Sequence, residues 1–193
     1  METVEQQKAL ADRILGGLKV ISPYAILAGG APRDWYFNEK ANDLDFYLYT
    51  SAMTLNAAKK QLARALGIDP SQIKTKSRID SSLYATMQCL RTILDVEGFD
   101  MPVQIMLLNE PKDEFKVVDV MSTSICKIFY HEGKIIPKQD FMLTVKTKII
   151  FLDEGYSWSD PHPTKIVNRF KHKFTTANKE RAMNRLLHSL VEV

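Results

Sequence analysis

The fold is decided between Ala25 and Tyr49, where the sequence reads A-I-L-A-G-G-A-P-R-D over residues 25–34 and, after eight more residues, D-L-D-F-Y-L-Y over residues 43–49. The apolar run that two glycines close predicts a short buried strand over 24–28. Pro32 suits the first turn of a short helix over 31–37. The second run is rich in aromatic residues and too short for a domain helix, which favours a second strand.

Gly29 and Gly30 stand where the first strand would turn into the short helix. Glycines at such a turn let backbone N–H groups approach an anion closely, and a helix N-terminus adds partial positive charge. A triphosphate would suit this arrangement, although a plain tight turn also uses glycine. The sequence has neither the G-x-x-x-x-G-K-[ST] pattern nor the G-x-G-x-x-G fingerprint.

Asp43 and Asp45 lie two positions apart, so on a strand both side chains point to one face. Two carboxylates there offer hard oxygen ligands suited to Mg²⁺. A D-x-D pair can also mark the solvated edge of a sheet. The apolar neighbours favour the metal site, because unpaired carboxylates are costly to bury and repel each other without a cation.

Arg33 and Asp34 follow the glycines in the short helix. The planar guanidinium of Arg33 is suited to binding a phosphate. Asp34 would then orient Arg33 or reach a ribose hydroxyl. Taken alone, the two residues also fit an exposed ion pair of little energetic consequence.

The order strand, G-G, R-D and then D-x-D on the next strand resembles the nucleotidyltransferases of the DNA polymerase β superfamily, especially tRNA CCA-adding enzymes and bacterial poly(A) polymerases. Their head motif is also G-G-x-x-R-D followed by D-x-D. The resemblance covers residues 25–49. It implies an α/β (α+β) fold and transfer of a nucleotidyl group from an NTP to a hydroxyl. It also implies that Asp43 and Asp45 are catalytic and hold two Mg²⁺ (or Mn²⁺) ions, with the nucleotide bound by Gly29, Gly30, Arg33 and Asp34.

The sequence departs from the family pattern in two respects. Family members often carry a third carboxylate on a later strand; the corresponding strand here is expected over 102–108, and its polar residue is Gln104, a weaker and neutral ligand. Asp100 and Glu97 stand just before that strand and would substitute if the register shifts. CCA-adding enzymes also carry further helical domains, so we expect a minimal stand-alone member. A weaker resemblance to such small members, some from bacteriophages, rests on residues 117–130.

Composition is that of an ordinary globular domain: 193 residues, 45% hydrophobic, 25% charged, with a net charge of +3 that is too small to indicate nucleic-acid binding. Two cysteines exclude a disulfide scaffold, and no Cys/His spacing suggests structural zinc. His162, His172 and His188 lack such partners and are expected at the surface. The polar N-terminus is no signal peptide and no apolar run would span a bilayer, so we expect a cytoplasmic protein without a membrane partner.

Positive charge gathers from Lys165 to Arg185, where Glu180 is the one acidic residue. We interpret this region as the surface that binds the acceptor, although a solvated helical face has the same composition. Prolines 161 and 163 mark the best boundary, between a nucleotidyltransferase core over 1–150 and a basic helical extension over 151–193. The residues expected to bind the acceptor are Lys165, Arg169, Lys171, Lys173, Arg181 and Arg185.

Periodicity and turn residues predict the other elements. We expect helices over 4–18, 54–66, 139–148, 165–174 and 178–191, with Thr54 as an N-cap and Gly67 as a helix stop. Strands are expected within 82–94, 102–108, 124–131 and 134–136, the last two as a hairpin around Gly133. This irregular mixture favours a mixed β-sheet flanked by helices, with a small helical C-terminal part.

Together these features predict a minimal, Mg²⁺-dependent nucleotidyltransferase whose acceptor is a hydroxyl, with an RNA or tRNA 3′ end favoured. A protein hydroxyl, as in small toxin-like relatives, is one alternative. Another is a non-catalytic module that retains the fold and binds nucleic acid through its basic face. Intact Asp43 and Asp45 favour the enzyme, and Gln104 favours the binding module. The sequence leaves the base preference and the oligomeric state open.

Overall fold

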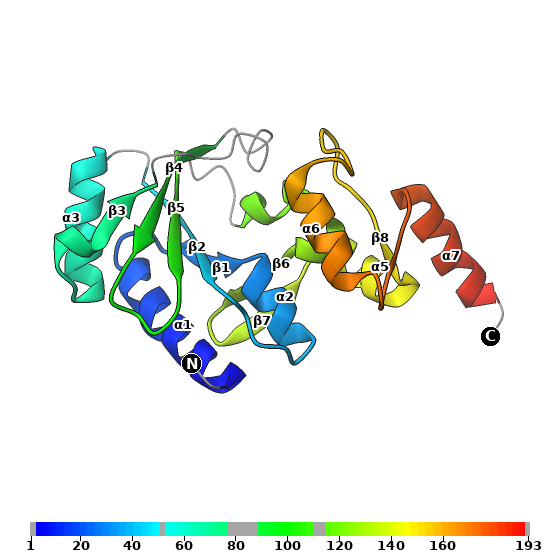
Figure 1. The fold of residues 1–193 in the computed structure, drawn as a ribbon, viewed down its shortest axis with the longest axis horizontal. Coiled ribbons are helices and arrows are strands. Elements are labelled where there is room, and N and C mark those ends of the chain that lie inside the picture. The colour runs from blue at the N-terminus through cyan, green and yellow to red at the C-terminus, as the bar shows by residue number, and fades with distance from the viewer. Residues whose placement is uncertain (1–2, 51–52, 77–88, 110–114, 192–193) are drawn as a thin grey trace.

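A seven-stranded sheet forms the centre of the structure, a computed structural model that describes residues 3–50, 53–76, 89–109 and 115–191. The strand order is β3-β4-β5-β2-β1-β6-β7 (Figure 1). β2 and β5 run parallel, and the other neighbouring pairs in this sheet are antiparallel. The strands are β1 (Ile26–Ala28), β2 (Leu44–Tyr49), β3 (Ile73–Thr75), β4 (Leu90–Val96), β5 (Val103–Leu108), β6 (Ile128–His131) and β7 (Lys134–Pro137).

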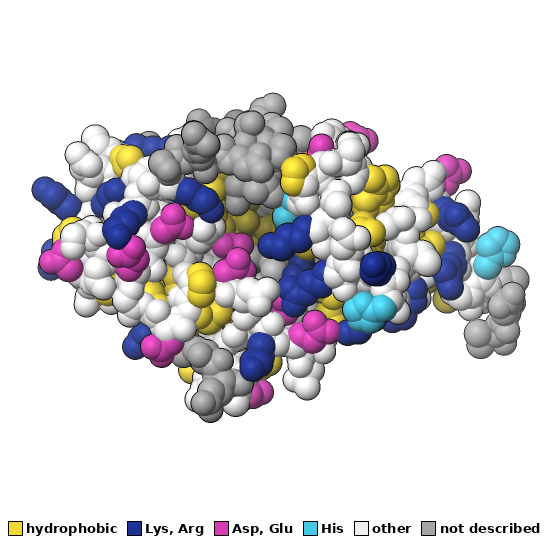
Figure 2. All heavy atoms as spheres, viewed as in Figure 1, with side chains coloured by type: hydrophobic (Ala, Val, Ile, Leu, Met, Phe, Trp, Pro, Cys, Tyr) yellow, Lys and Arg dark blue, Asp and Glu magenta, His cyan; other side chains and the backbone are white. Residues whose placement is uncertain are grey.

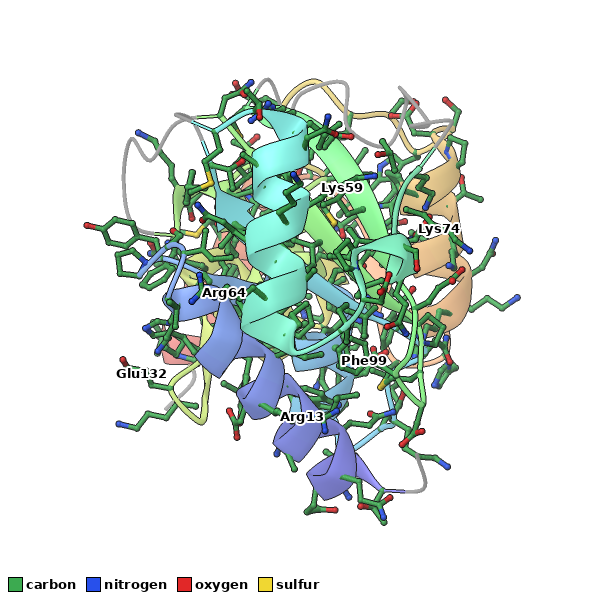
Figure 3. All side chains as sticks on the ribbon, turned by 90° about the vertical axis from the view of Figure 1, so that its left-hand side faces the viewer. Arg13, Lys59, Arg64, Lys74, Phe99 and Glu132 are labelled. Carbon is green, nitrogen blue, oxygen red and sulfur yellow. The ribbon has the colours of Figure 1, made fainter. Side chains whose placement is uncertain are left out.

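Helices α1 (Val4–Lys19) and α3 (Leu55–Leu66) lie on one face of this sheet (Figure 3). The Arg13 guanidinium of α1 lies over the Phe99 ring, 5.6 Å from the ring centroid, and so joins α1 to the β4–β5 turn. The opposite face carries α5 (Gln139–Thr147) and α6 (Pro161–Phe170), together with the short 3₁₀ helices η2 (Lys116–Val118) and η3 (Ser124–Cys126).

The remaining elements of the described residues are two helices, a small second sheet and a short 3₁₀ helix. α2 (Gly30–Tyr36) follows β1 directly, and α7 (Lys179–Val191) packs beside α5 at the end far from α3 (Figure 1). A small two-stranded parallel sheet joins β8 (Ile149–Ile150) to β9 (Thr175–Thr176), and η1 (Pro70–Gln72) precedes β3.

Local side-chain bonds fix the ends of the N-terminal helices. Thr3 and Gln6 form a reciprocal capping box at the start of α1, with bonds of 3.1 and 3.0 Å. The Thr54 hydroxyl accepts a bond from the Ala57 N–H, and Gly67 ends α3 in the left-handed region at φ 66°. The predicted start and stop of α3 are therefore confirmed.

Alternation along β2 separates two apolar cores. Leu44, Phe46 and Leu48 pack with α1 and α3, whereas Tyr47 and Tyr49 pack on the other face with residues of α5 and α6. Asp45 lies between Leu44 and Phe46 in β2, so its side chain points to the face that α6 covers. The alternation that buries the apolar side chains of β2 thus also determines the face of the sheet on which the Asp45 carboxylate lies.

The mixed sheet flanked by helices confirms the predicted fold class, and the predicted hairpin is β6–β7 around Gly133. Two predicted elements were wrong in extent. The strand expected over 124–131 begins only at Ile128, because Ser124–Cys126 form a 3₁₀ turn. The helix expected over 165–174 is α6, which begins at Pro161 and ends at Phe170. It begins earlier than predicted because prolines fit the first helical turn, which needs no N–H donor.

The strand expected within 82–94 appears as β4 from Leu90 to Val96, and residues 82–88 lie outside the described residues. β3 and the β8–β9 pair were not predicted. They hold three and two residues each, too few for a periodic signal.

Candidate active site

A cavity of about 380 Å³ lies between the sheet and α6. Figure 2 shows basic side chains on the α6 side of this hollow and acidic side chains on the sheet side. Its walls therefore carry opposite charges. The polar and glycine residues in the lining include Gly29, Gly30, Arg33, Asp34, Asp43, Asp45, Lys76, Gln104, Ser122, His162, Lys165 and Arg169.

The Gly29–Gly30 turn forms the floor beside β1. Gly29 has φ 80°, a conformation that favours glycine, and its N–H is bonded to the Ile128 carbonyl at 3.0 Å. A Cβ atom on Gly30 would lie 3.9 Å from Asp43 Oδ1. The turn therefore brings the start of α2 directly beside the first carboxylate, and N–H groups of a first helical turn have no partner within the helix.

Asp43 and Asp45 lie together on the sheet side of the cavity. Oδ1 of Asp45 is buried and has no hydrogen-bond partner among the described residues. Burial, followed by the neighbouring charge of Asp43, raises the pKa of Asp45 to about 7, while Lys76, Lys165 and Arg33 act in the opposite direction. An unpaired buried carboxylate oxygen beside a second carboxylate is an arrangement that a cation would stabilise.

The donor set at this point fits a hard divalent cation such as Mg²⁺ or Mn²⁺, because carboxylate oxygens are its preferred ligands. Asp43 and Asp45 would hold it, and the unpartnered Oδ1 of Asp45 supplies a free ligand atom. Within the described part of the chain, no group of three or more His, Cys, Asp or Glu side chains is arranged as a metal site. Phosphate oxygens and water would complete the coordination.

A row of three polar side chains crosses the sheet at Asp45. Gln104 on β5 stands opposite Asp45 in the parallel pair, and Asp95 on β4 stands opposite Gln104. The Gln104 amide donates to Asp95 Oδ1 at 2.7 Å. Gln104 therefore lies beside Asp45, as its strand position predicts, but its N–H is directed to a carboxylate that the sequence reasoning overlooked.

The two alternatives considered for a third carboxylate lie elsewhere. Glu97 forms an exposed ion pair with Lys74 at 2.5 Å, and Asp100 is exposed in the β4–β5 turn. Asp95 was overlooked because the strand was predicted only within 82–94, whereas β4 continues to Val96 and so includes Asp95. A strand alternation counted back from Val96 would have put Asp95 on the same face as Gln104.

Arg33 and Asp34 form a buried pair. Asp34 Oδ1 accepts from Arg33 Nε at 2.8 Å and lies 2.7 Å from Nη2, while Nη1 lies 3.4 Å from Cys126 Sγ. The guanidinium also stacks over the Phe170 ring at 4.9 Å. Burial raises the pKa of Asp34, and Arg33 and Arg169 counteract that effect. Arg33 lines the cavity, yet most of its donors already have partners inside the protein.

α6 forms the cationic wall. Lys165 and Arg169, one helical turn apart, line the same cavity as the two aspartates, and Arg169 Nη2 lies 2.8 Å from Asp34 Oδ2. Lys173 instead pairs with Glu39 at 2.5 Å. Lys171, Arg181 and Arg185 are exposed and do not line the cavity. The six residues expected to bind an acceptor thus fall into a cavity pair and an outer group.

Several polar residues of the cavity, among them His162 and Lys76, were not predicted from the sequence. His162 was expected at the surface, but it is half-buried, and its Nδ1 lies 2.7 Å from the Ser122 hydroxyl. The signal that could have found it is the proline at 161, which places His162 in the first turn of α6. Lys76 follows β3 and carries no pattern that sets it apart from other lysines.

No protein-family model matches the sequence, and no curated protein matches it. Among solved structures, a tRNA-processing enzyme in its apo form aligns with 100% of this chain and 48% of its own, at 17% identity and a TM-score of 0.55. A Thermotoga maritima CCA-adding enzyme complexed with tRNA gives 15% identity and a TM-score of 0.57 over 92% of this chain and 41% of its own. A CCA-adding enzyme complexed with CTP gives 17% identity and a TM-score of 0.53 over 92% and 42%.

These alignments show the fold: the chain has a nucleotidyltransferase-type mixed sheet. It spans less than half the length of the solved structures it matches. No helix in the described ranges is both long and apolar enough to cross a bilayer.

Proposed function

We propose that this chain is a nucleotidyltransferase that transfers a nucleotidyl group from an NTP to a hydroxyl acceptor, with Mg²⁺ or Mn²⁺ held by Asp43 and Asp45. The observation that carries the proposal is the buried, unpartnered Oδ1 of Asp45 beside Asp43, in a cavity whose opposite wall carries Lys165. A carboxylate pair facing a cationic wall suits a metal–triphosphate substrate, which brings both charges at once.

Each group of cavity residues has its own role in this reaction. Gly30 presents its first-turn N–H group to the β- and γ-phosphates, and Lys165 faces the same phosphates from α6. Gly29, whose own N–H is bonded to Ile128, shapes the turn that lets the phosphates approach. Asp43 and Asp45 fix the position at which the triphosphate and the acceptor hydroxyl meet. The acceptor hydroxyl then loses its proton to solvent and its oxygen bonds to the α-phosphorus. The bond from the α-phosphorus to the α–β bridging oxygen breaks as pyrophosphate leaves. The metal, when bound, would lower the pKa of the attacking hydroxyl and neutralise phosphate charge.

We favour an RNA 3′ end, and in particular a tRNA 3′ end, as the acceptor. The exposed group Lys171, Arg181 and Arg185 lies outside the cavity and offers charge to a polyanion. One matched structure is described as a complex with tRNA and another as a complex with CTP. A protein hydroxyl in place of the RNA 3′ end would use the same cavity chemistry.

The rival function is a non-catalytic module that binds nucleic acid. Gln104 favours this binding module, because its neutral amide stands opposite Asp45 on the neighbouring strand. A carboxylate at that position would strengthen metal binding. Gln104 is already engaged with Asp95 and so is not free to turn its amide nitrogen elsewhere without losing that bond.

A labelling experiment separates the three possibilities. The protein is incubated with each α-³²P NTP, Mg²⁺ or Mn²⁺, and either total RNA or an RNA-free protein extract, with Asp43→Asn and Asp45→Asn as controls. Label that is nuclease-sensitive and absent in both variants supports RNA transfer. Label that is protease-sensitive indicates a protein acceptor. NTP and RNA binding without label in any acceptor would indicate the binding module.

A further inference from the structure

His162 is a polar cavity residue to which the transfer reaction above gives no role. It lies in the first turn of α6, one turn before Lys165, and lines the cavity with Asp43 and Asp45. Its Nδ1 is 2.7 Å from the hydroxyl of Ser122, which is itself 4% exposed. One edge of the ring is thus held by the protein, and the other edge carries Nε2.

The hydrogen bond with Ser122 selects one form of the ring. A buried hydroxyl needs an acceptor for its proton, and His162 Nδ1 is the partner that the described residues offer to Ser122 Oγ. If Ser122 donates, Nδ1 carries a lone pair and Nε2 carries the proton. Protonating Nδ1 would take away that acceptor, so the arrangement favours a neutral imidazole with an Nε2–H donor.

Burial and nearby positive charges also favour the neutral ring. Burial first, then Arg33 of α2 and Lys165 of α6, lower the pKa of His162 to about 4. Asp43 and Asp45 on the sheet side also line the cavity but do not offset this effect. A neutral donor is poorly matched to a phosphate, which favours cations, and Lys165 already provides a cation one turn away.

We propose that His162 binds the nucleoside part of the substrate, donating from Nε2–H to an uncharged oxygen, a ribose hydroxyl or a base carbonyl, while Lys165 binds the phosphates. Ser122 is the positioning residue that sets the tautomer. The inference rests on the proposed NTP-binding function and divides the α6 wall into a nucleoside end and a phosphate end. The two ends differ in net charge, and inorganic tripolyphosphate can tell them apart because it has no nucleoside.

Calorimetry with Mg²⁺ and two ligands, inorganic tripolyphosphate and each of the four NTPs, tests this division. His162→Asn removes the Nε2–H donor, whereas His162→Gln places an amide N–H near the Nε2 position. We expect His162→Asn to weaken binding of at least one NTP about 5- to 10-fold, as for loss of one buried hydrogen bond, and to change tripolyphosphate binding less than about 2-fold. His162→Gln should recover most of the NTP affinity. Lys165→Gln, the matched control on the same helix, should weaken both ligands.

Modified nucleotides distinguish the two sources of the oxygen. If wild type binds a 2′- or 3′-deoxy NTP more weakly and His162→Asn adds no further loss, the acceptor is that ribose hydroxyl. If the loss on His162→Asn is unchanged with deoxy NTPs and differs among bases, the acceptor is a base carbonyl. Equal weakening of tripolyphosphate and NTP by His162→Asn, or no weakening of either, would overturn the inference. Wild-type protein that binds no NTP at all would overturn the proposed function as well.

A measurement on the wild-type protein tests the inference even if a His162 variant fails to fold. The ¹⁵N chemical shifts of the His162 ring report its tautomer and charge directly. We expect the neutral Nε2–H form from pH 6 to 8, and Ser122→Ala should mix the two tautomers. A ring protonated on Nδ1 at pH 7 in the wild type would contradict the proposed donor.

Discussion

Arg169 Nη2 of α6 forms an ion pair with Oδ2 of Asp34 on α2 at 2.8 Å, while Arg33 Nη2 lies 2.7 Å from the other carboxylate oxygen. Asp34 is therefore bridged by two guanidinium groups, and its own side chain is 2% exposed. The bridge joins the helix that follows the Gly29–Gly30 turn to the helix that carries Lys165. The C-terminal helix α6 is in this way part of the cavity wall.

The Asp34 bridge predicts a graded loss of stability. Asp34→Ala would leave Arg33 buried without a carboxylate, so we expect a loss of about 3–5 kcal/mol in the free energy of unfolding. Arg169→Ala keeps the inner pair and should cost about 1–2 kcal/mol. Lys173→Ala, which removes an exposed pair with Glu39 and a cation–π contact with the Phe37 ring, should cost about 0.5–1 kcal/mol. Urea unfolding measures all three, and equal losses for Arg169→Ala and Lys173→Ala would contradict the bridge.

Much of this arrangement was predictable because its signals are local. The apolar run before Gly29, the two glycines and the alternation of β2 fix the strand, the turn and the face of Asp45 within one short stretch. The same holds for α3, whose start and stop residues are adjacent to it. Each of these features depends on neighbours a few residues away. Asp43 precedes β2, so its place in the cavity lining does not follow from that alternation.

What could not be predicted depends on contacts distant in sequence. Arg33 and Asp34 fit an exposed pair equally well until Phe170 and Arg169 cover them. Lys165 belongs to a basic stretch, and its place in the cavity follows from how α6 packs on the sheet. His162 is half-buried, and its hydrogen-bond partner Ser122 lies 40 residues earlier in the chain.

Asp45 predicts an unusual dependence of stability on pH. Its folded-state pKa is about 7 against an ordinary value of 3.8, so its penalty is absent below pH 3.8 and grows as the pH rises toward 7. Asp45→Asn should therefore unfold at a higher temperature than wild type at pH 8, by about 2–4 °C for each kcal/mol gained. The difference should vanish near pH 4.

Metal addition and a matched variant serve as controls for the comparison of Asp45→Asn with wild type. Mg²⁺ at millimolar concentration should raise the unfolding temperature of wild type but not of Asp45→Asn. Asp100→Asn, an exposed carboxylate that does not line the cavity, should behave as wild type in both conditions. A lower unfolding temperature for Asp45→Asn at pH 8 without metal would show that Asp45 has a stabilising partner.

Under the proposed function, the division of the basic residues predicts separate effects on NTP binding and on RNA binding. Lys165→Gln should weaken NTP binding with little change in RNA binding. Lys171→Glu combined with Arg185→Glu should weaken RNA binding and flatten its salt dependence, because fewer counterions are released. RNA titrations at several salt concentrations, beside NTP calorimetry, measure both. An unaltered salt slope in the double variant would show that these residues form only a solvated face.

His162 predicts a loss of stability in acid. Its folded-state pKa is about 4 against an ordinary 6.5, so its contribution is fully present above pH 6.5 and is lost as the pH falls toward 4. Asn does not titrate, so His162→Asn should lose less stability than wild type over that interval. The free energy of unfolding of both proteins, measured from pH 7 to 4.5, gives the comparison. Parallel curves would contradict a half-buried imidazole that stays neutral in the folded protein.

Gln104→Asp tests the row that crosses the sheet. The change removes the bond to Asp95 and puts a third carboxylate between Asp45 and Asp95, so three like charges would stand side by side. Without metal we expect a lower unfolding temperature than wild type. With Mg²⁺ the added ligand should tighten metal binding, restore much of that loss, and keep or raise transfer activity. Gln104→Glu keeps the length of the native side chain and adds the same charge, but its carboxylate has no N–H to donate to Asp95, so it is the matched control for charge alone. A Gln104→Asp variant that Mg²⁺ cannot rescue, beside a fully active Gln104→Ala, would show that this position lies outside the metal site.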